Sequence, residues 1–225
     1  MKHTIFYLLL LMPLFFACTA EDLPSATNYG SLRIFPVEIE TEAEIEPIKR
    51  SVDSRLQVDI YQGSTIVRTY EAGSSELDGL IVLPVGSYTL TAHTPDMNEA
   101  ANEESGSPTY LVNRDFKIEP DITTTLGNLV ARQANIGINL QYTDELFTTG
   151  FMAISCTLTS PATGRTVTLQ GTDNPGMTYF NVPASGKLQY TIQATNTDGE
   201  QFTYGPKDME ATGAGNCLLL IGWSL

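Results

Sequence analysis

The sequence has 225 residues, of which 26 are acidic and 12 are basic, and its formal net charge at pH 7 is −14. So few lysines and arginines cannot neutralise a phosphate backbone, and the carboxylates repel it. The composition therefore excludes a nucleic-acid-binding protein. It favours a soluble protein whose copies repel one another.

Residues 1–17 have the pattern of a lipoprotein signal peptide. Lys2 precedes an apolar run from Ile5 to Phe16 that is too short to span a bilayer comfortably. The run ends in Ala17-Cys18, and a small residue before a cysteine resembles a bacterial lipobox, in which the cysteine sulfur is acylated. The alternative is an ordinary signal peptide cleaved near Ala20. Because no second apolar segment follows, the sequence predicts lipid on Cys18 as the membrane anchor.

Residues 18–29 are polar and acidic, without an apolar period, so we expect a flexible tether. Glu21 and Asp22 lie just after the cysteine and resemble the signal that sends Bacteroidetes lipoproteins to the outer face of the outer membrane. The sequence therefore predicts a lipid-anchored protein of the outer membrane that faces the cell surface.

The rest of the chain reads as short β-branched and aromatic runs separated by Gly, Pro, Asn and Asp, which is typical of an all-β protein. About seven such runs per hundred residues is the density of a β-sandwich. The expected strands are 31–40, 55–62, 64–71, 77–83, 87–94, 114–119 and 123–131 in the first half, and 134–143, 151–160, 166–171, 177–183, 187–196, 200–205 and 217–225 in the second. We therefore predict two tandem β-sandwiches of the transthyretin-like or Ig-like kind, over residues 30–132 and 133–225.

A recurring corner supports this division. The segment "VLPVGSYTLTAHT" at 82–94 has its counterpart in "NVPASGKLQYTIQAT" at 181–195. A proline ends one strand because it lacks an N–H donor, and a glycine permits the reversal into the next strand. Tyr88 or Tyr190 then follows, with its ring expected at the sandwich edge and its hydroxyl directed at solvent or a backbone carbonyl.

The sequence offers no catalytic site, and we expect no enzyme activity, metal or cofactor. His93 is the one histidine beyond the signal peptide, and we expect it at a solvent-exposed strand end. Cys156 and Cys217 lack C-x-x-C spacing and a nearby histidine, so they indicate neither a zinc site nor a thiol nucleophile. They form a disulfide in an oxidising envelope, or they are two buried thiols; both alternatives stay open.

The acid-rich segment 94–108 contains Asp96, Glu99, Glu103 and Glu104. It lacks the D-x-D-x-D-G ladder that places oxygens around one calcium ion, and it has no apolar stripe. We therefore expect a solvated loop.

The motifs "GSLRI", "KRSVDSRLQVDIYQG", "LPVGSYTLTA" and "PTYLVNRDFKIEPDITTTLGNLVARQANIGINLQYTDEL" occur in this order along the chain. In this order they resemble a family of Bacteroidetes lipoproteins, the domain of unknown function numbered 4493. That family is similar in plan to the fimbrillins, the subunits and anchors of Bacteroidetes pili. The resemblance covers residues 30 to about 220.

This resemblance implies that a trypsin-like protease cuts after an arginine in the loop beyond the first strand. Removal of that strand opens a groove, which a strand of the next subunit fills. Arg50 lies at the matching place, with Arg55 as the second choice, although Lys-Arg-Ser-Val stands where Thr-Arg-Ala is more usual. The partners implied are other pilin-like subunits, joined by donor-strand exchange.

Two functions follow as alternatives. The first is a structural or adhesive component of the cell surface, namely a fimbrillin-like pilus subunit or pilus anchor. The second is a surface lipoprotein that binds a glycan or a host protein through loops at the sandwich ends. Alignment of Tyr70, Tyr110, Tyr142 and Tyr204 on one exposed face would favour the second. The final segment 217–225 is expected as the last core strand of the second sandwich rather than as a donor strand.

Overall fold

A computed structural model describes residues 28–35, 37–40, 55–142, 149–171 and 176–221. It confirms the predicted all-β class. The first half contains β1 (Tyr29–Ile34), β2 (Val37–Ile39), β3 (Gln57–Gln62), β4 (Thr65–Tyr70), a 3-10 turn η1 (Ser75–Asp78), β5 (Ile81–Pro84), β6 (Gly86–His93), β7 (Tyr110–Ile118), β8 (Thr123–Leu126) and β9 (Leu129–Gln133). The second half contains β10 (Asn135–Tyr142), β11 (Phe151–Thr159), β12 (Thr166–Gln170), β13 (Met177–Asn181), β14 (Lys187–Asn196), β15 (Gln201–Glu210) and β16 (Gly215–Ile221).

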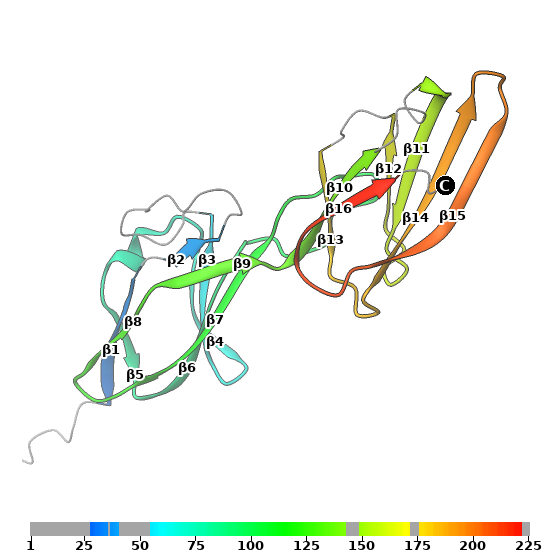
Figure 1. The fold of residues 1–225 in the computed structure, drawn as a ribbon. Coiled ribbons are helices and arrows are strands. Elements are labelled where there is room, and N and C mark those ends of the chain that lie inside the picture. The colour runs from blue at the N-terminus through cyan, green and yellow to red at the C-terminus, as the bar shows by residue number, and fades with distance from the viewer. Residues whose placement is uncertain (1–27, 36, 41–54, 143–148, 172–175, 222–225) are drawn as a thin grey trace, which may run out of the picture.

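The two halves form two sandwiches that lie end to end (Figure 1). In the N-terminal sandwich, a small sheet with the order β5-β1-β8 faces a large sheet with the order β2-β9-β7-β6-β3-β4. In the C-terminal sandwich, a small sheet β13-β10-β16 faces a large sheet β12-β11-β14-β15. Each large sheet thus contains the same run of four strands, β7-β6-β3-β4 in one and β15-β14-β11-β12 in the other.

Each sandwich has its own hydrophobic core, because alternate side chains of its strands point inward. Buried residues of the first core lie between Leu32 and Ala131, and those of the second lie between Ile136 and Ile221. We therefore propose that the chain divides into two domains near residue 133. The sheet topology repeats one strand order in the two halves, in agreement with the recurring corner of the sequence.

Several strands differ from the expected ones. The predicted strand 123–131 is two strands, β8 and β9, in different sheets, and the predicted strand 77–83 begins only at Ile81, as β5. The predicted strand 31–40 is two strands, β1 and β2, that belong to different sheets. Strand β7 begins at Tyr110, before the predicted residue 114. Strand β15 continues past Gly205-Pro206 to Glu210. Proline is tolerated there because β15 is the outermost strand of its sheet, where a missing N–H interrupts no ladder.

The signal peptide and most of the tether lie outside the described residues, and β1 begins at Tyr29, one residue inside the predicted tether. In the described part of the chain, no helix has the length and apolar character that a bilayer crossing needs.

Candidate functional site

The first strand, β1, lies in the middle of the small N-terminal sheet. It runs antiparallel to β5, with Ser31 opposite Val82, and parallel to β8, with Ser31 opposite Thr123. The Ser31 N–H donates to Ile122 O over 3.0 Å, on the β8 side, and Asn28 O accepts from the Val85 N–H over 2.8 Å, on the β5 side. Both edges of β1 are therefore occupied, and its loss would leave a gap between β5 and β8.

The chain then crosses to the other sheet as β2, which pairs in parallel with β9. Val37 lies opposite Leu129 and Ile39 opposite Ala131. The Glu40 N–H donates to Ala131 O over 3.0 Å, and the exposed Glu40 carboxylate forms an ion pair with Arg132. One short segment thus contributes a strand to each sheet of the N-terminal sandwich.

The inward side chains of this segment belong to the core, and all are less than one-tenth exposed: Leu32, Ile34, Val37 and Ile39. At the start of β1 the backbone packs closely against the turn before β8. A Cβ on Gly30 would lie 2.2 Å from Glu119 O, a distance that real side chains do not tolerate. Glycine at position 30 is therefore required by close packing of the backbone.

Of the residues predicted for processing and lipidation, Cys18 and Arg50 lie outside the described residues. Arg55 is exposed, and the next residue, Leu56, is fully buried. Strand β3 begins at Gln57. A cut after Arg55 would therefore place a new charged terminus on a core residue.

Cys156 and Cys217 are free thiols in the structure. Cys156 lies on β11 in the large sheet and Cys217 on β16 in the small sheet, and both pack into the C-terminal core. Burial raises the pKa of the Cys156 thiol to about 12. A thiol with such a pKa stays protonated and is a poor nucleophile. The disulfide stays a prediction.

His93 does not lie at a solvent-exposed strand end, contrary to the sequence-based expectation. Its side chain is 15% exposed, and its Nε2 lies 3.0 Å from Oδ2 of Asp59, a buried carboxylate on the neighbouring strand β3. Thr69 Oγ1 also donates to Asp59, over 2.7 Å. Burial by itself would raise the pKa of Asp59, but the hydrogen bonds from Thr69, His93 and Gln57 outweigh burial and lower it.

The two predicted tyrosine corners differ in their contacts. The Tyr88 hydroxyl donates to Pro84 O over 2.8 Å, and its ring stacks on Phe116. The ring of Tyr190 instead lies 6.4 Å from the ring of Tyr204, centroid to centroid, at a tilt of 41°. The predicted contact with a backbone carbonyl is thus present in the N-terminal sandwich, while Tyr190 faces an aromatic neighbour on β15.

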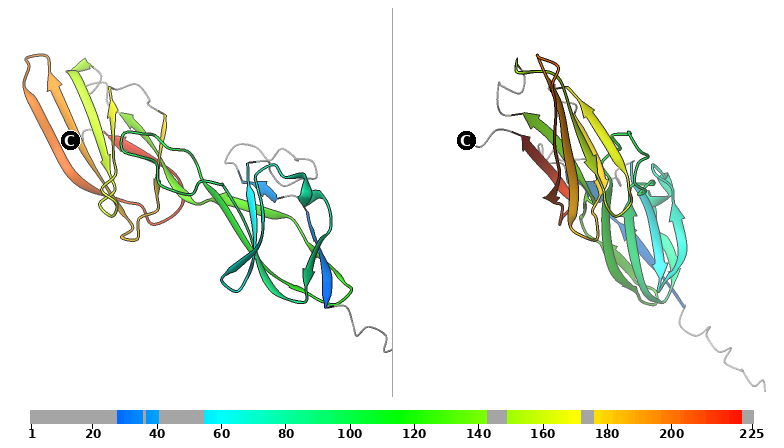
Figure 2. Two further views of the ribbon diagram at one scale, coloured as in Figure 1. Left: turned by 180° about the vertical axis from the view of Figure 1, so that it is seen from behind. Right: turned by 90° about the vertical axis from the view of Figure 1, so that its right-hand side faces the viewer.

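The acid-rich segment is a largely exposed loop, as expected, but it is held against the C-terminal sandwich by hydrogen bonds that the sequence did not indicate. Residues 94–109, here called the strap, leave the N-terminal sandwich and lie along one side of the C-terminal sandwich (Figure 2). The Glu103 N–H donates to Thr166 O of β12 over 2.9 Å, and the Tyr179 N–H of β13 donates to Ser105 O over 2.7 Å. Because β12 and β13 are edge strands of opposite sheets, the strap closes the gap between the two sheets.

The side chain of Arg165 holds the strap against the C-terminal sandwich. This side chain is buried, and its guanidinium donates to Ala101 O over 3.2 Å, to Tyr179 O over 2.6 Å and to Glu104 O. The guanidinium carbon also lies 4.3 Å from the centroid of the Phe180 ring, in a cation–π contact. One buried cation therefore joins strap, strand edge and core.

The acidic side chains of the strap cap free backbone N–H groups of the edge strands. Glu99 accepts from the Asn181 N–H over 3.1 Å, and Glu103 accepts from the Thr168 N–H over 2.9 Å. Within the described residues, no group of three or more His, Cys, Asp and Glu side chains is arranged to hold a metal ion. The carboxylates of Glu99 and Glu103 thus accept hydrogen bonds from the second sandwich, whereas those of Asp96 and Glu104 accept from backbone N–H groups within the strap.

The opposite side of the C-terminal sandwich ends in β15 and β16. Strand β16 is parallel to β10 and contributes Ile221 to the core, as expected for a last core strand. Phe202 and Tyr204 on β15 and Leu218 and Leu220 on β16 are each about half exposed. Among the described strands, none pairs with the outer edge of β15 or β16.

The four tyrosines that would indicate an aromatic binding platform do not share one face. Tyr70 is buried, and Tyr70 and Tyr110 pack against the N-terminal core. Tyr142 packs against the C-terminal core, and only Tyr204 of the four is exposed. The structure therefore gives no support to a platform of these side chains.

A family model described as "Domain of unknown function (DUF4493)" matches residues 28–216. A search of curated proteins found no match. Among solved structures, a "putative adhesin" from Bacteroides ovatus is similar at 9% identity and a TM-score of 0.45, over 82% of this chain and 83% of that one.

Two further solved structures are similar over most of their length. "Putative polysaccharide binding proteins (DUF1812)" from Bacteroides thetaiotaomicron match at 8% identity and a TM-score of 0.46, over 88% of this chain and 91% of that one. The fimbrial anchor protein Mfa2 from Porphyromonas gingivalis matches at 9% identity and a TM-score of 0.36, over 78% and 81%.

Proposed function

We propose that this chain, which belongs to the DUF4493 family, is a structural or adhesive component of the cell surface, a pilus subunit or pilus anchor that assembles by exchange of its first strand. The observation that carries the proposal is the position of β1–β2. This N-terminal segment is paired on both sides in one sheet and adds a strand to the other. Its loss would open backbone edges and an apolar trench that a strand of another subunit could fill.

The free energy that β1–β2 contributes by burial favours replacement of this segment by another strand over its removal without a replacement. Each of its four buried aliphatic side chains contributes roughly 1.5–3 kcal/mol by burial, so the segment contributes about 6–12 kcal/mol. The net stability of a whole domain is about 5–15 kcal/mol. A sandwich without β1–β2 would therefore be marginal at best, and it needs either the cleaved strand or a replacement.

The position of the chain connection between β2 and β3 is compatible with such an exchange. A cut after Arg50 would separate β1–β2 from β3 without touching another described strand. In this proposal the cut protein keeps its first strand by non-covalent contacts until a neighbour's strand displaces it. We also propose that Cys18 carries lipid and holds the uncut protein on the outer membrane, facing outward.

A disulfide across β1 and β5 tests the proposal directly. Ser31 and Val82 are partners in antiparallel strands, and Ser31 directs its N–H away from β5. They are thus a non-hydrogen-bonded pair, with Cα atoms about 4.5 Å apart, within the range of a disulfide. The double variant Ser31→Cys/Val82→Cys can be locked by oxidation and released by a reductant.

We expect wild-type protein, once cut by trypsin, to form SDS-resistant polymers. The oxidised double variant should be cut but stay monomeric, and reductant should restore assembly. The single variant Ser31→Cys controls for the native cysteines and should assemble like wild type. Assembly of the locked variant at the wild-type level would refute strand exchange at this site.

A further inference from the structure

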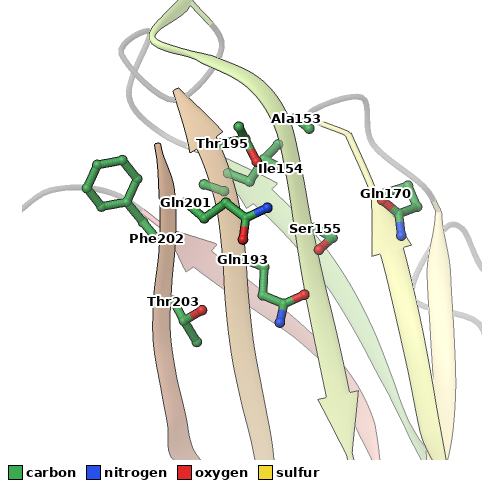
Figure 3. A pocket seen from close by; sticks show the side chains of 10 residues that line it. Ala153, Ile154, Ser155, Gln170, Gln193, Thr195, Gln201, Phe202 and Thr203 are labelled. Carbon is green, nitrogen blue, oxygen red and sulfur yellow. The ribbon is translucent and has the colours of Figure 1, made fainter. Parts of the chain in front are cut away.

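The outer face of the large C-terminal sheet has a hollow of about 220 Å³ (Figure 3). Six uncharged polar side chains line it: Ser155, Gln170, Gln193, Thr195, Gln201 and Thr203. They come from β11, β12, β14 and β15, so the whole width of the sheet contributes. Side chains at these positions point away from the core, because their strand neighbours Ile154, Leu169 and Ala194 are the buried ones.

The hollow exists because small residues lie between long ones. On β11, Ala153 and Ser155 occupy the middle of the face. Ser155 lies opposite Gln170 on β12 and opposite Gln193 on β14, and Gln193 lies opposite Thr203 on β15. Two glutamines thus rise on either side of a short serine, which leaves room for a ligand group between their carboxamides.

In the N-terminal sandwich, the polar side chains at the corresponding positions of the large sheet form hydrogen bonds with one another. These four residues, from β4 to β7, are Thr69, Asp59, Thr91 and Asn113. Thr69 donates to Asp59 over 2.7 Å, and Thr91 donates to Asn113 over 2.8 Å. By contrast, within the described residues, the side chains of Gln170, Gln193 and Gln201 make no hydrogen bond to another protein group. Their hydrogen-bonding capacity is available to a ligand.

The chemistry of the hollow selects an uncharged ligand. No Asp, Glu, Lys or Arg lines it, although the chain has 26 acidic residues. Each carboxamide offers two N–H donors and a carbonyl acceptor, which can engage two neighbouring hydroxyl groups at once. We propose that this face binds a neutral saccharide, with Gln170, Gln193 and Gln201 as its principal contacts.

The site lacks an aromatic side chain on which a sugar ring could stack, so we expect its affinity to be low. The ring of Phe202 points away from the hollow (Figure 3). Binding then rests on a few hydrogen bonds, each of which changes the affinity by roughly two- to tenfold. We therefore expect millimolar binding to a single copy. Repetition along a filament would raise the avidity, and this part alone rests on the proposed function.

The test uses the uncut, monomeric chain and follows the side-chain amide resonances of its glutamines by NMR. The ligands are maltoheptaose, cellohexaose, mannohexaose, xylohexaose and galactohexaose, with polygalacturonate as a charged comparison and a polyglycine peptide as a polypeptide comparison. We expect at least one neutral oligosaccharide to shift the resonances of Gln170, Gln193 and Gln201 in a saturable manner, while the charged polymer and the peptide leave them unchanged.

The variant Ala153→Gln fills the hollow without removing a hydrogen bond. It should weaken binding about tenfold or more, the equivalent of losing one or two hydrogen bonds. The control Gln141→Ala removes an exposed glutamine from β10, on the other sheet, and should leave binding unchanged. No saturable shift with any neutral oligosaccharide, shifts with the polyanion or the peptide instead, or full binding by Ala153→Gln would each overturn the proposal. Because the monomer is used, a failure of strand exchange would not affect these results.

Discussion

The two sandwiches share one strand order but close their sheets in different ways. In the N-terminal sandwich, β1–β2 and β8–β9 each run from the small sheet into the large one. In the C-terminal sandwich, the corresponding strands β10 and β16 belong to the small sheet alone, and the gap between β12 and β13 is closed by the strap. One sandwich is thus closed by its own first and last segments, and the other by a segment borrowed from its neighbour.

This difference indicates where the molecule can be opened. The first segment of the N-terminal sandwich reaches both sheets and precedes the connection in which we propose the cut, so its removal would affect both sheets at once. The first strand of the C-terminal sandwich, β10, follows directly from β9 and is enclosed by β13 and β16. Strand exchange is therefore expected in the N-terminal sandwich, while the C-terminal one stays intact.

The largest expected effect distinguishes the two cores. Leu32→Ala removes a fully buried side chain from β1 and should lower the free energy of unfolding of the N-terminal sandwich by roughly 3–5 kcal/mol. Leu188→Ala, at a fully buried position on β14, is the matched change in the other core. Hydrogen exchange should show lost protection in β3, β6 and β7 for the first variant and in β11 and β14 for the second. Equal loss in both halves for either variant would contradict two separate cores.

The next effect concerns the strap. Arg165→Met keeps much of the side-chain volume but removes a buried cation that donates to three backbone carbonyls. We expect a loss of roughly 2–4 kcal/mol from the C-terminal sandwich and rapid proteolysis of residues 94–109.

The matched control for Arg165→Met is Arg132→Met. Arg132 has an exposed side chain and an ion pair with the exposed Glu40. Such a surface pair contributes little, about 0–1 kcal/mol. Similar proteolysis of the two variants would show that the strap is held by something other than Arg165.

A smaller effect separates the two tyrosine corners. Tyr88→Phe removes a hydroxyl that donates to Pro84 O and should cost about 1 kcal/mol. Tyr190→Phe should cost less, because the hydroxyl of Tyr190 interacts with the exposed Tyr204. Urea unfolding of both variants measures the difference. A larger loss for Tyr190→Phe would mean that the second corner is the more important one.

The last prediction concerns the stability of the N-terminal sandwich in acid, where Asp59 is expected to contribute. The pKa of Asp59 is lowered in the folded state. A lowered pKa adds stability above the unfolded-state pKa of about 3.9, and this stability is lost as the pH falls through the folded-state value. Unfolding midpoints of wild type should therefore begin to fall near the unfolded-state pKa of about 3.9 and continue to fall as the pH is lowered further. Asp59→Asn should show a weaker decline over this range, and an identical decline would rule out Asp59 as its source.

Local pattern predicted most of the strands, but not the pairing that makes the site. Alternating apolar residues and the Pro-Gly corners locate β6 and β14 to within one residue. The change of sheet between Ile34 and Val37 was missed, although the apolar alternation shifts by one residue there, from Leu32 and Ile34 to Val37 and Ile39. The division into two similar halves followed from the recurrence of the corner, since the same local signals came twice in one sequence.

The strap could not be predicted from the sequence, because its partners are distant. Arg165 donates to Ala101, 64 positions earlier, and nothing near either residue indicates the other. A buried Asp59 was missed for a similar reason, since its partners Thr69 and His93 lie on two other strands. The hollow likewise depends on the register of four strands, which no single stretch of sequence contains.

The most direct test of strand exchange is the intact mass and N-terminal sequence of the protein in its assembled form, isolated from the native outer membrane. Strand exchange predicts an N-terminus at Ser51, with the preceding residues, and therefore β1–β2, absent from the assembled subunits. Assembled subunits that begin at an acylated Cys18 and still contain residues 29–39 would contradict it.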